Sequence, residues 1–190
     1  MRRVLFSPIW LVLFFLAAGA ARAADTAPLA ELAKPGRVLM LRHAHAPGTG
    51  DPPNFRLENC ATQRNLDAAG RAQAVALGKR LDQAGIARAR VYSSQWCRCL
   101  ETARLLGLGA VEMLPALNSF YERPQEREAS VAALRGFLAA LPMDGPPVVL
   151  VTHQVTVNAF TDAGTPSGGG SVFELNGSGT PRWLGAIQAD

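Results

Sequence analysis

Hydrophobic and polar positions along the chain change period several times, which predicts strands and helices in alternation. Residues 37–41 and 148–152 each contain four consecutive apolar residues rich in Val and Leu, a pattern typical of strands buried on both faces. Residues 91–92 and 111–114 predict two further short strands. The chain therefore contains at least four candidate strands, and the segments between them have the longer period of helices.

The clearest helical pattern begins after Asp67, a good capping residue, and runs to about Ala84, where Gly85 ends it. Its apolar positions, which we expect to face the core, are Ala68, Ala72, Val75, Leu77 and Leu81. Further helices are predicted over residues 96–106, 130–141 and 155–160. In the second of these three, the residues expected to face inward are Leu134, Phe137 and Leu138.

The C-terminal part of the chain has the pattern of a hairpin, with apolar runs at 172–175 and 183–187 separated by Gly177-Ser178-Gly179. Strands that alternate with helices predict an α/β fold: a three-layer sandwich whose central sheet is mostly parallel and flanked by helices, with the hairpin at one edge. In such sheets the ligand lies at the carboxyl ends of the strands. Arg42-His43, Ser93-Ser94 and His153 all follow predicted strands there, so the topology should bring them together.

The first 23 residues have the layout of a secretory signal. Arg2 and Arg3 precede a mostly apolar run over residues 4–18, and Ala21-Arg22-Ala23 places small residues where a signal peptidase reads. The run is shorter than the about 20 apolar residues of a spanning helix. We therefore expect residues 1–23 to be a cleaved signal, residues 24–190 to form one domain, and the product to be periplasmic or secreted without a stable membrane anchor. An uncleaved anchor is the alternative.

Removal of that signal changes the charge of the protein. The whole chain has 19 basic and 15 acidic residues, but three arginines lie within residues 1–23, so the remainder carries a net charge of +1. No cluster of Lys and Arg forms a footprint for a phosphate backbone, so nucleic acid is not an expected partner. The mature protein relies on arginine rather than lysine, which suits bidentate contacts to phosphate or carboxylate.

Two of the three histidines, His43 and His153, end buried strands, and Arg42 directly precedes the first of them. Phosphoryl transfer needs an uncharged nucleophile and cations that hold the equatorial oxygens. An imidazole next to guanidinium groups stays neutral near pH 7 because its protonated form is disfavoured. This scheme requires no metal and no cofactor, and the carboxylate clusters of a metal-dependent phosphatase are missing from the sequence.

Four segments in this order resemble the motifs of the histidine phosphatase superfamily, which includes phosphoglycerate mutases, acid phosphatases and phosphohistidine phosphatases. They are Leu41-Arg42-His43-Ala44, then Leu66-Asp67 with Gly70 and Gln73-Ala74, then Ser93-Ser94 with Arg98 and Thr102-Ala103, and finally Val151-Thr152-His153. Together they span nearly all of residues 24–190. The resemblance implies that His43 is the phosphorylated nucleophile, that Arg42, Arg98 and His153 form the phosphate pocket, and that His153 stabilises the transition state.

The sequence departs from the family pattern in ways that leave the leaving-group acid unassigned. Ala44 replaces the usual glycine, and Gln154 follows the second histidine where acid phosphatases have aspartate. Ser119 takes the place of the mutase glutamate, and Glu122 is the nearest carboxylate. Phosphohistidine phosphatases of the family lack such an acid, and the Arg-His-Ala-His-Ala segment resembles their compact first motif.

Other residues near these motifs have two open interpretations each. His45 could contact substrate at the rim of the pocket or face solvent. Trp96, Phe120 and Tyr121 could line the pocket, although core packing is expected for at least two of them.

The three cysteines, Cys60, Cys97 and Cys99, do not form a zinc-binding pattern. In an oxidising compartment one disulfide is expected, with one thiol left over. A bridge from Cys97 to Cys99 would close too tight a ring, so we expect Cys60 to pair with either Cys97 or Cys99. The alternative is that all three are small buried residues.

These observations predict an exported phosphohydrolase that cleaves small phosphomonoesters, or a phosphoramidate, through a phosphohistidine intermediate. A phosphatase resembling the lipopolysaccharide-core heptose phosphate phosphatases, which are periplasmic, is one alternative, whereas a mutase is disfavoured because glycolytic intermediates are not exported. A phosphate-ligand binding module with little turnover is another. The substrate is not readable, because the segments that would set it, residues 47–58 and 119–128, contain no diagnostic motif. The oligomeric state is not readable either.

Overall fold

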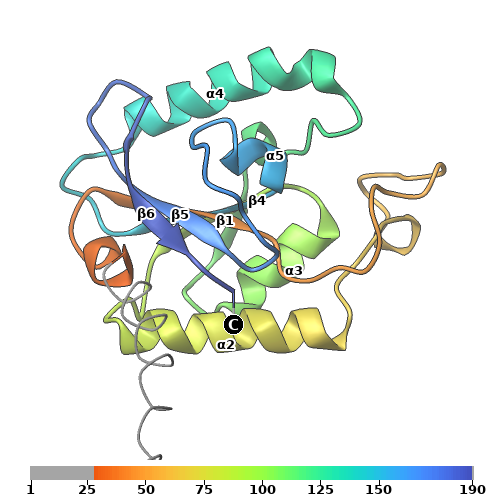
Figure 1. The fold of residues 1–190 in the computed structure, drawn as a ribbon, viewed down its shortest axis with the longest axis horizontal. Helices are drawn as coiled ribbons and strands as arrows, with labels where there is room; N and C mark the ends of the chain where they lie inside the picture. The colour runs from red at the N-terminus through yellow and green to blue at the C-terminus, as the bar shows by residue number, and fades with distance from the viewer. Residues whose placement is uncertain (1–27, 190) are drawn as a thin grey trace, which may run out of the picture.

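A mixed sheet forms the centre of the protein in the computed structural model, which describes residues 28–189. The predicted signal over residues 1–23 lies outside the described residues. The strands of the sheet are arranged in the order β3-β2-β4-β1-β5-β6 (Figure 1). Their bounds are β1 Arg37–Arg42, β2 Arg90–Ser93, β3 Val111–Met113, β4 Val148–Thr152, β5 Gly170–Glu174 and β6 Arg182–Ile187.

Strands β3, β2, β4 and β1 run parallel, and β5 and β6 add an antiparallel hairpin at one edge, as predicted. The register of the two central strands matters most for the site. Arg42 of β1 lies opposite Thr152 of β4, so the residues that follow, His43 and His153, emerge side by side. The predicted convergence of the two histidines at the carboxyl edge is therefore what the register produces.

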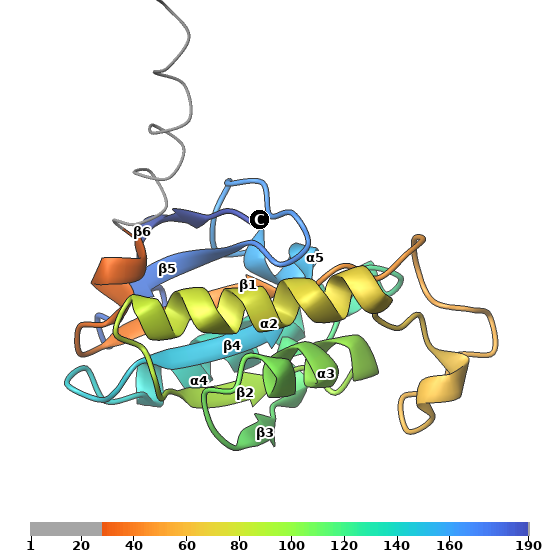
Figure 2. The same cartoon turned by 90° about the horizontal axis from the view of Figure 1, so that it is seen from below.

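Helices cover both faces of the sheet and complete three layers (Figures 1 and 2). Helices α2 (Ala68–Gln83) and α3 (Cys97–Leu105) lie against one face, and α4 (Arg127–Ala140) and the short α5 (Gln154–Val157) lie against the other. Three 3₁₀ helices lie in the connecting segments: η1 Cys60–Thr62, η2 Pro115–Leu117 and η3 Pro124–Glu126. The predicted α/β sandwich is confirmed. None of the helices in the described range is long and apolar enough to cross a membrane.

Alternation along the strands divides the core into two clusters. Leu39 and Leu41 of β1 pack with residues of α2 and α3, whereas Val38 and Met40 of the same strand pack with residues of α4. Successive side chains of a strand point to opposite faces, so an unbroken apolar run is required when helices cover both faces. The five residues of β4 are buried for the same reason.

Helix α2 begins as predicted but faces the core with a different side. Asp67 caps it by accepting a hydrogen bond from the backbone N–H of Gly70 at 2.7 Å. Three residues of its predicted apolar face, Ala68, Ala72 and Val75, are exposed. The buried residues are Gly70, Ala74, Leu77, Gly78 and Leu81.

Close backbone approach explains this correction. A Cβ atom on Gly70 would overlap the carbonyl oxygen of His45, and one on Gly78 would overlap the carbonyl oxygen of Leu106. Which face of α2 packs against the core therefore depends partly on where side chains are absent. Hydrophobic periodicity does not detect such positions. As a consequence α2 supports both the segment after β1 and the end of α3 at close range.

Candidate active site

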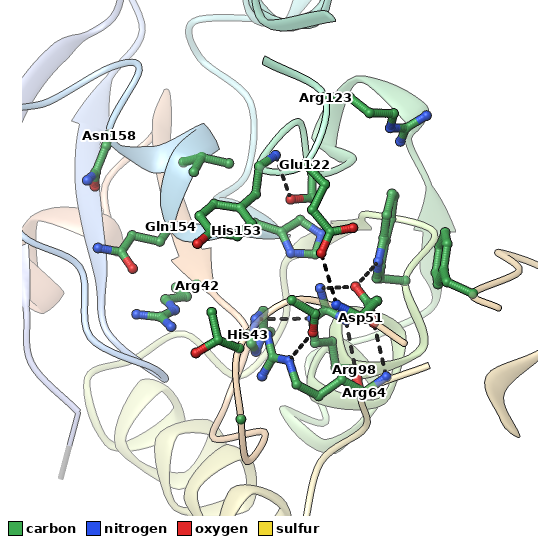
Figure 3. Close-up of a pocket in the computed structure, with 18 residues that line it drawn as sticks. Arg42, His43, Asp51, Arg64, Arg98, Glu122, Arg123, His153, Gln154 and Asn158 are labelled. Carbon is green, nitrogen blue, oxygen red and sulfur yellow. Dashed lines mark hydrogen bonds and ion pairs between the residues drawn. The ribbon is translucent and has the colours of Figure 1, made fainter. Parts of the chain in front are cut away.

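A cavity of about 550 Å³ opens at the carboxyl edge of the sheet (Figure 3). Arg42, His43, Arg98 and His153, the four residues predicted from the sequence, all line it. They come from the end of β1, the first turn of α3 and the end of β4. The structure therefore brings together side chains from positions 42 to 153 of the chain, at the carboxyl ends of the strands, as predicted.

His43 is buried and held in one protonation state by two contacts. Its Nδ1 lies 2.7 Å from the carbonyl oxygen of Ala44, so Nδ1 carries the proton and donates it. Its Nε2 accepts a hydrogen bond of 3.2 Å from the Nε–H of Arg98, which requires a lone pair on Nε2. Burial, and then the charge of Arg98, lower the pKa of His43 to about 3. The ring is thus neutral, with the lone pair of Nε2 on the side of Arg98.

Arg42 lies beside this ring at the end of β1. One of its Nη groups donates to the carbonyl oxygen of Thr165 at 2.9 Å, while its buried Nε has no hydrogen-bond partner among the described residues. Burial and the charge of Arg98 lower the pKa of Arg42. A buried guanidinium N–H without an acceptor is rare. Arg42 also lines the cavity, where its guanidinium can bind an anion.

Arg98 does not stand free in the cavity, because the carboxylate of Asp51 binds it with two hydrogen bonds of 2.8 and 3.0 Å. Both side chains are almost fully buried, with 4% of Arg98 and 7% of Asp51 exposed. The indole N–H of Trp96 also donates to Asp51, at 3.0 Å. Asp51 was not predicted from the sequence. A buried arginine requires a carboxylate partner, and this requirement was the available signal.

Arg64 is a second cavity residue that the sequence did not reveal. It is half-buried, its Nε donates to the carbonyl oxygen of Gly50, and its Nη1 donates to that of Ala46. Burial and the charge of Arg98 lower the pKa of its guanidinium. Figure 3 shows Arg64 next to Arg98 and Asp51. Four arginines therefore line the cavity, because Arg123 lines it together with Arg42, Arg64 and Arg98.

His153 also lines the cavity, and the centre of its ring lies 5.5 Å from the centre of the His43 ring. Its Nε2 lies 2.9 Å from the hydroxyl of Ser94 and 3.5 Å from the thiol of Cys99. Both contacts use Nε2, which leaves Nδ1 as the ring nitrogen for a ligand. Burial, followed by the proximity of His43 and Arg98, holds the pKa of His153 well below its ordinary value. A bound phosphate dianion would oppose that shift by favouring the protonated ring.

The sequence from residue 38 to residue 124 matches a sequence model of the Histidine phosphatase superfamily (branch 1). The matched segment includes His43, Arg42 and Arg98. The chain belongs to the histidine phosphatase superfamily. The resemblance of the motifs is thereby confirmed, and membership supports a phosphatase that acts on a small phosphorylated substrate. No curated protein matches the sequence.

Solved structures of phosphatases share the fold of this protein. The protein histidine phosphatase SixA in complex with tungstate is 19% identical, with a TM-score of 0.61 over 80% of this chain and 96% of the other. A putative phosphohistidine phosphatase SixA from Agrobacterium tumefaciens is 21% identical, with a TM-score of 0.56 over 82% and 99%. A mycobacterial glucosyl-3-phosphoglycerate phosphatase in complex with VO3 is 19% identical, with a TM-score of 0.55 over 78% and 96%.

The two positions considered for a leaving-group acid are occupied by a serine and an exposed glutamate. Ser119 and the exposed Glu122 both line the cavity, and Glu122 accepts a hydrogen bond of 3.2 Å from the backbone N–H of Asp51. Within residues 28–189, no three His, Cys, Asp or Glu side chains gather where they could hold a metal ion. Glu122 is a candidate acid because it lines the cavity.

The structure distinguishes between the two interpretations given for the aromatic residues and for His45. Trp96 and Phe120 are buried, whereas Tyr121 is exposed at the cavity rim, so core packing holds for two of the three as expected. Trp96 lines the cavity as well, stacked on Phe55. The side chain of His45 is about half exposed, and its Nε2 lies 3.7 Å from Asp67 rather than in the cavity wall.

A disulfide joins Cys60 to Cys97, one of the two predicted pairings, and Cys99 is the buried free cysteine. Burial raises the pKa of the Cys99 thiol to about 12. The disulfide ties η1 to the residue that precedes Arg98. The backbone N–H of Cys97 also donates to the side chain of Gln63 at 2.9 Å, so two links hold the start of α3 to the segment before α2.

Proposed function

We propose that this protein is an exported, metal-independent phosphatase that cleaves phosphomonoesters, or a phosphoramidate, through a phosphohistidine on His43. The observation that carries the proposal is the protonation state of that ring. Nδ1–H donates to the carbonyl oxygen of Ala44, and Nε2 accepts a hydrogen bond from Arg98. The lone pair of the ring must therefore lie on Nε2. A neutral imidazole fixed in this way is ready to attack phosphorus without losing a proton first.

The first step forms the bond from Nε2 of His43 to phosphorus and breaks the bond from phosphorus to the leaving oxygen or nitrogen. Arg42 and Arg98 would hold the equatorial oxygens, and His153 would stabilise the charge that builds on them. The leaving group departs with a proton from water or from an acid such as Glu122. Water then attacks the phosphohistidine, which releases inorganic phosphate and restores the neutral ring.

The decisive experiment compares residues 24–190 of the wild-type protein with His43→Ala and His45→Ala on a generic aryl phosphate, whose leaving group needs little protonation. His45→Ala is the matched control, because it makes the same change two residues away at a side chain outside the cavity lining. We expect phosphate release to vanish in His43→Ala and to persist in His45→Ala. A quenched wild-type reaction should retain an acid-labile, base-stable phosphoryl label. Equal activity in both variants would refute the role of His43.

A phosphate-ligand binding module is the second candidate, favoured because Ser119 stands where the family's mutases have their acid and because the buried carboxylate at the cavity, Asp51, is bound to Arg98. It predicts that phosphate or vanadate binds but that the aryl phosphate stays intact. Export is tested separately, by locating the full-length chain after expression and sequencing its N-terminus. A panel of phosphorylated sugars, including lipopolysaccharide-core heptose phosphates, together with phosphohistidine peptides and small metabolites, would then identify the substrate.

A further inference from the structure

The five N–H groups of Arg98 are divided between two tasks. Three of them are directed away from His43: Asp51 accepts one from each Nη nitrogen, and the carbonyl oxygen of Arg64 accepts the other Nη1–H at 3.2 Å. The Nε–H donates to Nε2 of His43. One Nη2–H remains, and the planar geometry of the guanidinium places it on the same side as the Nε–H.

We propose that Asp51 is a positioning residue that holds Arg98 by its Nη1/Nη2 end, so that the Nε–H and the remaining Nη2–H form the fork for phosphate. This inference rests on the proposed phosphatase function. The bond from Nε2 of His43 to phosphorus uses the lone pair that the Nε–H of Arg98 now contacts, so this N–H would then donate to a phosphoryl oxygen instead. Arg98 would then bind phosphate through Nε and Nη2 while its Nη1 and Nη2 groups stay bonded to Asp51.

The surroundings of Asp51 support a fixed clamp. Its Oδ1 accepts from Arg98 and from the backbone N–H of Arg64 at 3.0 Å, and its Oδ2 accepts from Arg98 and from the indole of Trp96. Four donors thus converge on one buried carboxylate. Burial alone would raise the pKa of Asp51, but these hydrogen bonds and the charge of Arg98 hold it below its usual range. Asp51 therefore stays ionised, and both of its carboxylate oxygens are engaged.

The clamp also explains how a residue of a Gly- and Pro-rich loop can act in the site without touching the substrate. Asp51 is linked through Arg64 to the segment before α2, and through Trp96 to the start of α3. Figure 3 shows Asp51 and Arg98 joined by dashed lines, with Arg64 beside them and His43 on the far side of Arg98. A misplacement of about 1 Å at such a group can cost on the order of 100-fold in rate.

The competing interpretation is that Asp51 occupies the place of phosphate and must be displaced before substrate binds. The two interpretations predict opposite signs for Asp51→Asn, which keeps the shape of the side chain but turns N–H groups toward Arg98 or Trp96. A clamp predicts that vanadate affinity and kcat fall by about 10- to 100-fold. A displaceable plug predicts that vanadate binds more tightly, because a negative charge has been removed.

The experiment measures vanadate binding by calorimetry and aryl phosphate turnover for wild type, Asp51→Asn, Arg98→Ala and the double variant. Asp144→Asn is the control, because it makes the same chemical change at an exposed residue in the loop before β4, at the opposite edge of the sheet. We expect Asp51→Asn to weaken vanadate binding in the wild-type background and to have no further weakening effect in Arg98→Ala. Equal losses in both backgrounds, or tighter binding, would overturn the clamp.

A second measurement uses the wild-type protein and does not depend on how Asp51→Asn folds. In ¹⁵N NMR spectra, vanadate should shift the Nε–H resonance of Arg98 while the Nη1–H resonances and the indole N–H of Trp96 stay in place. Displacement of Asp51 would move all of them and refute the clamp. If the protein hydrolyses the aryl phosphate and Asp51 is displaced, the clamp is refuted and the proposed phosphatase function stands. Vanadate binding with the clamp intact but without turnover refutes only the phosphatase, and no vanadate binding overturns both.

Discussion

Breaking the bridge between Cys60 and Cys97 should both destabilise the fold and loosen the site. The bridge joins residues 37 positions apart, and the chain-entropy estimate for a loop of that size is about 4 kcal/mol at 25 °C. For a domain of this length that corresponds to a fall of about 8–16 °C in Tm. Because Cys97 directly precedes Arg98, we also expect weaker binding of vanadate.

The assay compares the oxidised protein with and without a reductant, by urea unfolding, thermal unfolding and vanadate titration. Cys60→Ser/Cys97→Ser is the control: it should have the lower Tm from the start and should not respond to reductant. Counting thiols in the denatured, unreduced protein checks the premise, since one free thiol is expected from Cys99. Three free thiols would rule out the bridge, and a reduced protein with unchanged Tm and vanadate affinity would refute the link between the bridge and the site.

Three further predictions concern the chemistry of the cavity. Arg98→Lys keeps the charge but loses the fork, so kcat/KM should fall by an amount equivalent to roughly 2–4 kcal/mol, and a fully active lysine variant would place Arg98 outside the reaction. A chelator should leave turnover unchanged, and a loss that magnesium or zinc restores would show that a metal takes part. Because the pKa of His43 is lowered to about 3, its ring stays neutral through mildly acidic pH. Once substrate ionisation is corrected for, kcat/KM should therefore show no acid limb near 6.5, and a limb at that pH would contradict the buried, neutral ring.

Hydrophobic periodicity predicted most of the fold because it reports burial directly. Strand β4 begins and ends where the apolar pattern at residues 148–152 does. The C-terminal hairpin forms as well, with the glycines in its turn. Helix α2 shows where the method fails. Its inner face includes Gly70 and Gly78, and a hydrophobicity pattern treats glycine as neutral although close backbone approach requires it.

The candidate site was predictable only as far as strand ends position it. Arg42 ends β1, and His43 and His153 follow β1 and β4, so topology alone brings them together. Asp51 lies in a loop whose path depends on tertiary contacts, and its partner Arg98 is 47 residues away. No local pattern encodes such a pair, although the burial of Arg98 implies that a carboxylate exists somewhere.

Gly70 is not among the residues that line the cavity, yet it sets how closely the segment after His43 packs on α2. A methyl group there would drive the backbone of His45 outward, and with it the neighbouring Ala44 carbonyl that fixes the proton of His43 on Nδ1. In a screen for loss of function, Gly70 would therefore score with the active-site residues. An engineer who wished to decorate α2 would do better at Ala68 or Ala72, which face solvent.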